Sequence, residues 1–147
     1  MEAAARLARP LQLSADWTFT DAKYRDLITE DGENLAGTRV FNTAEYVGVT
    51  ALDFEIPGAG WHVRGAANAV GPYTPFDEPG VSLPAYVLFH LSGDVRVGPA
   101  TLELGIRNLL DHAYPELRAG GFVAPGQPRT VYAGVRYGIT RPASSGP

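Results

Sequence analysis

The sequence predicts an all-β protein, an antiparallel up-and-down meander of about seven strands that forms part of a transmembrane β-barrel. Three observations favour this fold class. Apolar and polar residues alternate with a period of two, as they do in strands with one apolar and one polar face. Short and long connections between the expected strands alternate along the chain. The two faces also differ, since one gathers charges and the other gathers small and aromatic residues.

The alternation is clearest in the last two expected strands. Leu102, Leu104 and Ile106 share one face of the first, and every second residue from Val131 to Ile139 shares one face of the second. Earlier stretches repeat the pattern and extend the meander toward the N-terminus. All seven expected strands are residues 2–9, 11–19, 44–56, 61–69, 86–97, 101–107 and 130–139.

The connections between these strands alternate in length. Tight turns are expected at Pro10, at residues 57–60 and at residues 98–99, whereas residues 21–42, 71–84 and 108–128 form long loops. An antiparallel meander places successive connections at opposite ends, so the long loops would share one end. Short turns on one side and long loops on the other are typical of outer-membrane barrels. Residues 1–139 are therefore expected to form barrel wall, followed by a disordered tail, 140–147.

Alternation alone also fits a small soluble β-sandwich or a lipocalin-like ligand-binding module, which stays the alternative. Three features favour lipid on the apolar side. Small residues such as Ala15, Gly48 and Ala67 would pack a soluble core poorly. Aromatic residues such as Trp17 and Trp61 fall near strand ends, as interfacial girdles require. Charges recur on the opposite face, at Asp16, Glu45, Asp53, Glu55, Arg64, Asp94, Arg96, Glu103, Arg107 and Arg136.

Composition narrows the possible functions. The chain has 147 residues, a net charge of −4 and no basic cluster, which argues against a nucleic-acid partner. It has no cysteine, which excludes disulfides and zinc–thiolate sites. No apolar run reaches the roughly 18 residues of a membrane helix. Seven strands cannot close a single-chain bacterial barrel, which has an even number of strands, so the chain is expected to be a fragment of a larger barrel.

Two segments carry a resemblance to a known family. Residues 104–111 read LGIRNLLD and are followed by Tyr114, and residues 125–137 read PGQPRTVYAGVRY. This pattern resembles the C-terminal end of TonB-dependent outer-membrane receptors, the plugged transporters for siderophores, cobalamin and haem. Residues 13–22 and 31–37 resemble the strand-and-loop pattern of the same family, so the resemblance covers about the whole chain up to Ile139.

The resemblance implies a function and a location. It implies a receptor that takes up a scarce ligand, such as an iron–siderophore, across the outer membrane of a Gram-negative bacterium. The implied partners are the lipid bilayer, the remainder of the barrel with its plug domain, the TonB complex acting indirectly, and a metal chelate as ligand. It implies no enzyme activity and no cofactor.

The candidate site residues form two groups. The first carries the family pattern and is expected to be structural, because Asn and Asp side chains cap turning backbone amides and tyrosine anchors near headgroups. Its members are Asn108, Leu109, Asp111, Tyr114, Arg129, Tyr132 and Tyr137. The second lies in the long loops and could contact a ligand, because loops carry function on rigid scaffolds. Its members are Tyr24, Arg25, Arg39, Tyr73, Phe76, Arg118 and Phe122.

Catalytic and metal-binding patterns are weak. His90, Ser92 and Asp94 share a strand face, but neighbours at this spacing lie about 6.5–7 Å apart, beyond the roughly 3 Å reach of a hydrogen bond. The three histidines, His62, His90 and His112, lack the spacing of a metal-ligand motif. We therefore predict no catalytic residue, no metal site and no cofactor.

Overall fold

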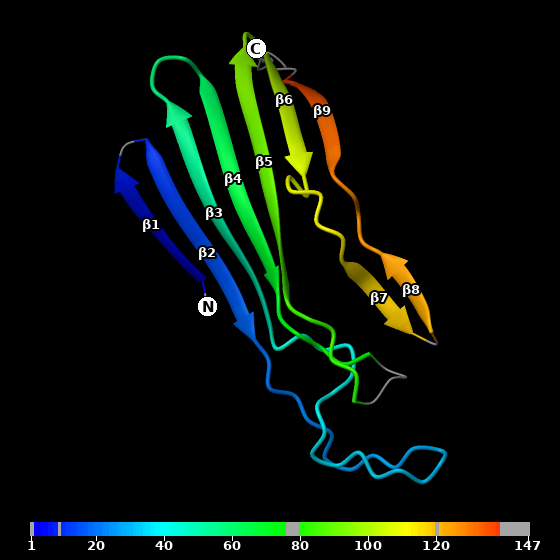
Figure 1. Ribbon diagram of the computed structural model, residues 1–147. Helices are drawn as coiled ribbons and strands as arrows, with labels where there is room; N and C mark the ends of the chain where they lie inside the picture. Colours follow the sequence, from blue (N-terminus) through cyan, green and yellow to red (C-terminus); the bar gives the residue numbers. More distant parts are fainter. Residues whose placement is uncertain (1, 9, 76–79, 120, 139–147) are drawn as a thin grey trace, which may run out of the picture.

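The computed structural model describes residues 2–8, 10–75, 80–119 and 121–138. Seven strands form one antiparallel sheet in the order β1-β2-β3-β4-β5-β6-β9, and a separate hairpin pairs β7 with β8 (Figure 1). The predicted meander is confirmed. The strands are β1 (Glu2–Ala8), β2 (Leu11–Phe19), β3 (Tyr46–Ile56), β4 (Trp61–Val70), β5 (Tyr86–Val97), β6 (Ala100–Arg107), β7 (Pro115–Ala119), β8 (Phe122–Pro125) and β9 (Thr130–Tyr137).

The hairpin of β7 and β8 differs from the sequence prediction, which placed a plain loop over residues 108–128. The two strands have five and four residues, too short for a period of two to stand out. The turn between them includes Gly121, whose φ of 72° suits glycine. The expected tail, residues 140–147, and Ile139 lie outside the described residues.

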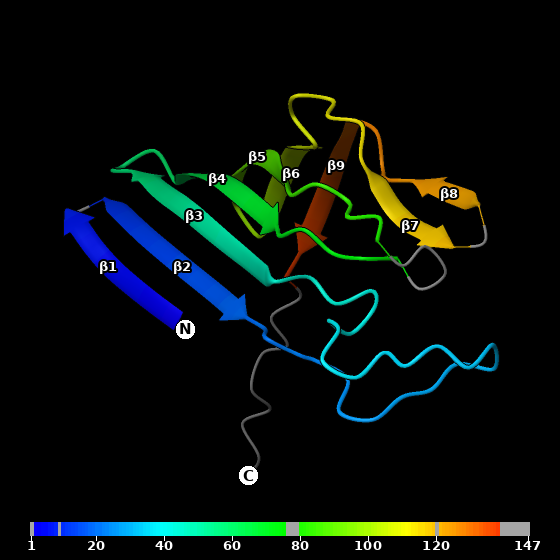
Figure 2. The same ribbon diagram turned by 60° about the horizontal axis from the view of Figure 1, so that its bottom comes forward.

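Tight and long connections lie at opposite ends of the sheet (Figure 1). The β1–β2, β3–β4 and β5–β6 turns form what we call the tight-turn end. The β2–β3, β4–β5 and β6–β9 connections form the loop end. Figure 2 shows that the sheet twists and curves along its strand order, and that the β2–β3 loop and the β7–β8 hairpin project beyond it.

The strand register gathers the apolar residues on one side. Leu52 of β3 pairs with Leu13 and with Gly65, and Leu102 of β6 pairs with Val95 and with Val135. We call this side the apolar face. It comprises every second residue, counted from the first, of 11–19, 46–56, 61–69, 87–97, 100–106 and 131–137. The residues between them make the polar face.

The apolar face is open to its surroundings. Phe54 is 40% exposed, Leu104 60% and Val135 72%. Within the described ranges the buried apolar side chains are those of Leu35, Ala51, Ala69, Pro75 and Leu83, and three of these lie in loops. The second sheet among the described residues is the two-stranded β7–β8 hairpin, which projects beyond the main sheet (Figure 2) and does not form the covering layer that the alternative β-sandwich would require. An apolar surface of this extent marks contact with lipid or protein rather than water.

The long loops are ordered by their own backbone bonds. Isolated bridges join Lys23 to Arg39 and Tyr73 to Leu83, within the β2–β3 and β4–β5 loops respectively. The two loops also meet, because the backbone N–H of Asn42 donates to the carbonyl of Thr74 over 2.8 Å. The two loops therefore form a joint platform at the loop end of the sheet. The described ranges contain no helix that is long and apolar enough to span a bilayer.

Candidate functional site

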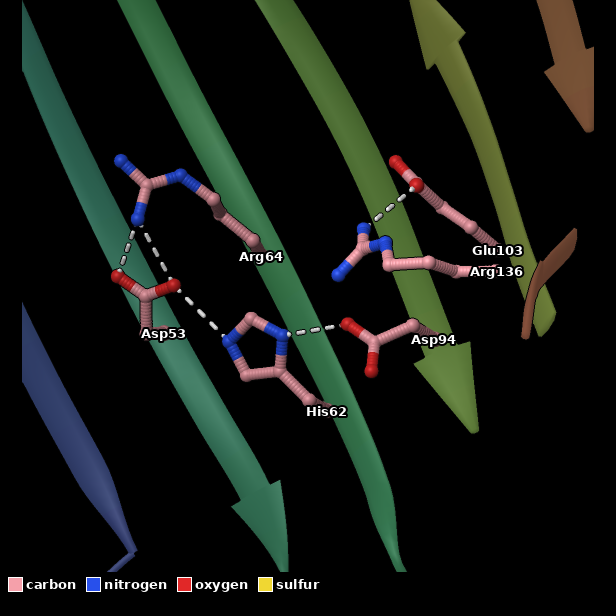
Figure 3. Close-up of polar contacts among 6 residues, drawn as sticks. All are labelled: Asp53, His62, Arg64, Asp94, Glu103 and Arg136. Atoms are coloured by element: carbon pink, nitrogen blue, oxygen red, sulfur yellow. Dashed lines mark hydrogen bonds and ion pairs between the residues drawn. The ribbon is translucent and has the colours of Figure 1, made fainter. Parts of the chain in front are cut away.

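A network of charged side chains crosses three strands on the polar face, in its tight-turn half. Arg64 of β4 donates through Nη1 to both carboxylate oxygens of Asp53 on β3, over 2.9 and 2.6 Å. The ring of His62 lies between Asp53 and Asp94 of β5 (Figure 3). Its Nε2 is 3.0 Å from Asp53 Oδ1 and its Nδ1 is 2.9 Å from Asp94 Oδ1.

The register explains why these groups meet. Asp53 pairs with Arg64 across β3 and β4, and His62 pairs with Asp94 across β4 and β5. His62 and Arg64 are two residues apart, so they lie on the same face of β4. Asp53 is therefore within reach of both. The sequence pattern predicted Asp53, Arg64 and Asp94 on the polar face, but their contacts through His62 depend on the register.

A second ion pair lies farther along the sheet. Arg136 of β9 approaches Glu103 of β6 to 3.6 Å, diagonally across the strand pair (Figure 3). The Arg136 side chain is 80% exposed, so water screens the pair and its contribution is about 0–1 kcal/mol. The network near His62 is less exposed, with Asp53 at 19%.

The polar face is hollowed at this network. The hollow has a volume of about 1080 Å³. Its polar lining comes from five strands and includes Gln12, Asp53, Glu55, His62, Arg64, Asp94, Arg96 and Thr101. Within the described residues no group of three metal-ligating side chains is placed to hold an ion. This arrangement is a partly exposed, charged wall that suits contact with water or with a polar protein segment.

His90, Ser92 and Asp94 are not brought together as a catalytic group. Asp94 contacts His62 instead. His90 accepts a hydrogen bond at Nδ1 from the backbone N–H of Asn108, over 3.3 Å. Because that N–H occupies Nδ1, the neutral ring carries its proton on Nε2.

The loop end is closed by what we call the clasp, formed by Asn108, Asp111 and Tyr114 against residues 126–129. Asn108 is only 2% exposed and adopts a φ of 50°. Its Nδ2 donates to the carbonyls of His112 and Gln127 over 3.0 and 2.9 Å, and its Oδ1 accepts from the His112 N–H over 2.9 Å. Its buried amide is therefore fully paired.

Asp111 and Tyr114 complete the clasp. Asp111, with a φ of 54°, accepts from the Arg129 N–H at Oδ1 over 2.8 Å. The Tyr114 hydroxyl accepts from the Gln127 N–H over 3.2 Å, and its ring lies against Gly126, where a side chain would not fit. The Tyr114 ring also packs against that of Tyr86, with ring centroids 4.7 Å apart and an angle of 30° between the ring planes. Asn108, Asp111 and Tyr114 each form hydrogen bonds with backbone groups of the β6–β9 connection.

The other residues of the family pattern lie apart from the clasp. Leu109 donates its N–H to the carbonyl of Phe89 over 2.7 Å and so keeps the end of β6 on β5. Tyr132 lies over Gly105 and receives the Arg107 guanidinium at 5.2 Å from its ring centroid. Tyr137 lies on the apolar face at the tight-turn end and is 65% exposed.

The predicted loop contacts fall into separate places. Arg39 bonds the carbonyl of Thr20 over 3.3 Å, pairs with Glu45 at 3.3 Å and lines a hollow of about 380 Å³ between two loops. Tyr24 packs its ring edge-on against Phe41, and Arg25 is exposed. Burial raises the pKa of the Tyr73 hydroxyl. Arg118 and Phe122 lie on the β7–β8 hairpin, and Phe76 lies outside the described residues.

An aromatic cluster marks the apolar face at the loop end. Trp17, Phe19 and Tyr46 have ring centroids 6.0–6.3 Å apart. Trp17 donates through Nε1 to Thr50 Oγ1 over 3.1 Å, and its ring covers Gly48. Rings with an apolar body and a polar edge suit the boundary between lipid tails and headgroups. The sequence showed the aromatics near strand ends, but not that three of them meet.

Comparison with known proteins shows which fold the chain shares. No protein-family model matches the chain. The antiparallel meander, polar on one face and exposed and apolar on the other, has the fold of part of a receptor barrel. Among solved structures it is similar to the ferric yersiniabactin uptake receptor FyuA from Yersinia pestis, with a TM-score of 0.73 and 20% identity. The match covers 92% of this chain and 22% of that receptor, so the predicted resemblance is confirmed for the fold.

Proposed function

We propose that this chain is part of the wall of a TonB-dependent outer-membrane receptor for a scarce ligand such as an iron–siderophore. The observation that carries the proposal is the exposed apolar face of a sheet that has the fold of a receptor barrel segment. Leu104 and Val135 of this face are 60% and 72% exposed. In a bilayer such residues gain from contact with lipid tails, whereas the charged face meets water or protein.

The two edges of the sheet support the need for further barrel strands. In an antiparallel sheet of seven strands, the first and last run in the same direction, so β1 and β9 both run from the loop end to the tight-turn end. If they met, they would pair in parallel. A second copy with the same orientation across the membrane would pair in parallel too. Antiparallel closure therefore requires an odd number of additional strands, which gives the even total of bacterial barrels.

In the proposed mechanism the loop end and the polar face have different roles. The loop platform and the β7–β8 hairpin would face outward and capture the ligand. The charged polar face would meet the plug domain, and the TonB complex would act on that plug from the periplasm. The chain would supply wall and loops, while the coupling to energy would reside in the other parts of the receptor.

The test is uptake in the producing bacterium with the gene deleted or restored. Cells are limited for iron and offered four labelled probes in turn: iron bound to a hydroxamate, iron bound to a catecholate, haem and cobalamin. We expect deletion to lower uptake of one probe, restoration to recover it, and collapse of the proton-motive force to abolish the recovered part. Unchanged uptake of all four probes, or a protein that is soluble in buffer without detergent, would contradict the proposal.

A further inference from the structure

His62 is held between two carboxylates that belong to different strands. Its Nε2 is 3.0 Å from Asp53 Oδ1 and its Nδ1 is 2.9 Å from Asp94 Oδ1. Asp53 lies on β3 and Asp94 on β5, with His62 on β4 between them. The ring therefore links, through side chains, two strands that do not pair with each other.

The proton count of the ring decides whether both contacts can hold. A neutral imidazole has one N–H and one lone pair, whereas the doubly protonated ring has two N–H donors. An ionised carboxylate can only accept. Both contacts are hydrogen bonds only when both ring nitrogens carry a proton. With one proton removed, a lone pair on nitrogen would face a carboxylate oxygen, and that contact would be repulsive.

We propose that His62 is a proton-operated bridge that ties β3 to β5 across β4 and opens when the ring loses one proton. The His62 side chain is 35% exposed, so water can exchange its proton. Arg64 keeps two hydrogen bonds to Asp53 in either state. Within the part of the chain that the structure describes, Asp94 pairs with no second cation, so Asp94 is the carboxylate that the open bridge releases into the hollow.

Other charges face this bridge from each neighbouring strand. Glu55 adds a negative charge on β3, and Arg64 a positive charge on β4. Arg96 lies on the polar face of β5, and Glu103 of β6 pairs with Asp94 in the register. Residue 12 of β2 is the neutral Gln12. The ring is thus the group of this surface that gains or loses a proton near neutral pH. The proposal depends on the register of β3 to β5 and not on the uptake function.

The bridge is tested by comparing the full chain with its Asp94→Asn variant in detergent. An asparagine at this position can donate to the unprotonated Nδ1, so it keeps the bridge closed when the ring is neutral. We expect the amides of β5 around residue 94 to exchange about three- to tenfold faster in the unmodified chain than in the variant at high pH. At low pH the two should match. Comparing the same amides cancels the intrinsic effect of pH on exchange.

A spectroscopic measurement and a control variant complete the test. Nitrogen-15 spectra of the three histidine side chains can be assigned with His90→Gln and His112→Gln. They should show two protonated ring nitrogens on His62 at low pH and one at the higher pH at which the bridge is open. Asp16→Asn, on the exposed polar face of β2, is the matched control and should behave as the unmodified chain does. Equal pH dependence in the unmodified chain and Asp94→Asn, or a singly protonated His62 throughout, would overturn the proposal.

Discussion

The two ends of the sheet are held together in different ways. At the tight-turn end, side chains on neighbouring strands pair with each other, as Asp53 does with Arg64. At the loop end most side-chain hydrogen bonds go to backbone groups, as those of Asn108 do to the carbonyls of His112 and Gln127. The difference follows from the backbone. Within the sheet the ladder satisfies N–H and C=O groups, whereas a chain that leaves the sheet needs other partners for them.

The same difference predicts where a substitution costs most. The ion pairs at the tight-turn end are partly exposed, so water and salt screen them. The clasp is buried at Asn108, and a lost partner leaves buried polar groups unpaired. We therefore expect the loop end to be the more sensitive of the two.

The largest effect is expected for Asn108→Ala. It removes three side-chain hydrogen bonds and places an alanine at a φ of 50°, so the free energy of unfolding should fall by about 2–4 kcal/mol. Asn108→Gly removes the bonds but tolerates the backbone, and should recover about 1 kcal/mol of that loss. Denaturant unfolding in detergent measures both. Asn68→Ala, a half-buried residue of β4, is the control, and an equal loss there would refute a special role for the clasp.

An intermediate effect is expected for Gly126→Ala. A side chain at this position would overlap the ring of Tyr114, so the ring must leave its place against Tyr86, at a cost of about 1–3 kcal/mol. Gly134→Ala is the matched control, because the nearest atom to a side chain there would be Glu103 Cβ at 4.0 Å. Tyrosine fluorescence and unfolding curves report the two changes. A harmless Gly126→Ala would mean that Tyr114 does not pack as described.

The smallest effect is expected for Asp53→Asn at the tight-turn end. It weakens the contacts with Arg64 and His62, and partial exposure limits the loss to about 1 kcal/mol. The difference from the unmodified chain should shrink as salt is added, because salt screens the pair. A loss as large as that of Asn108→Ala, unchanged by salt, would erase the contrast between the two ends.

Much of the fold follows from local features of the sequence. Alternation and turn residues predicted the ends of the seven strands of the sheet to within about two residues. A strand with one apolar and one polar face shows that difference as a change of residue type at every second position. The four-residue turn at 57–60 even fixes the pairing of Asp53 with Arg64. The β7–β8 hairpin was missed, since so short a pair shows no period.

The side-chain contacts could not be predicted in the same way. The bond from Asn108 to Gln127 joins residues 19 apart, and it depends on the path of the intervening loop. The place of His62 between Asp53 and Asp94 depends on three strands and on the direction of one ring. The sequence supplied the residue types, and the distant contacts were set by the fold. The loop contacts proposed for ligand stay a prediction.

The most direct test of the central claim asks which face meets lipid. The chain has no cysteine, so single substitutions can be spin-labelled one at a time. Leu104→Cys and Glu103→Cys are neighbours on β6 with opposite facing, and Leu104 is 60% exposed. In outer-membrane vesicles from producing cells, we predict that the label at 104 meets oxygen dissolved in lipid and the label at 103 meets a water-soluble nickel complex. The reverse pattern, or nickel access at both positions, would contradict the assignment of the apolar face to the bilayer.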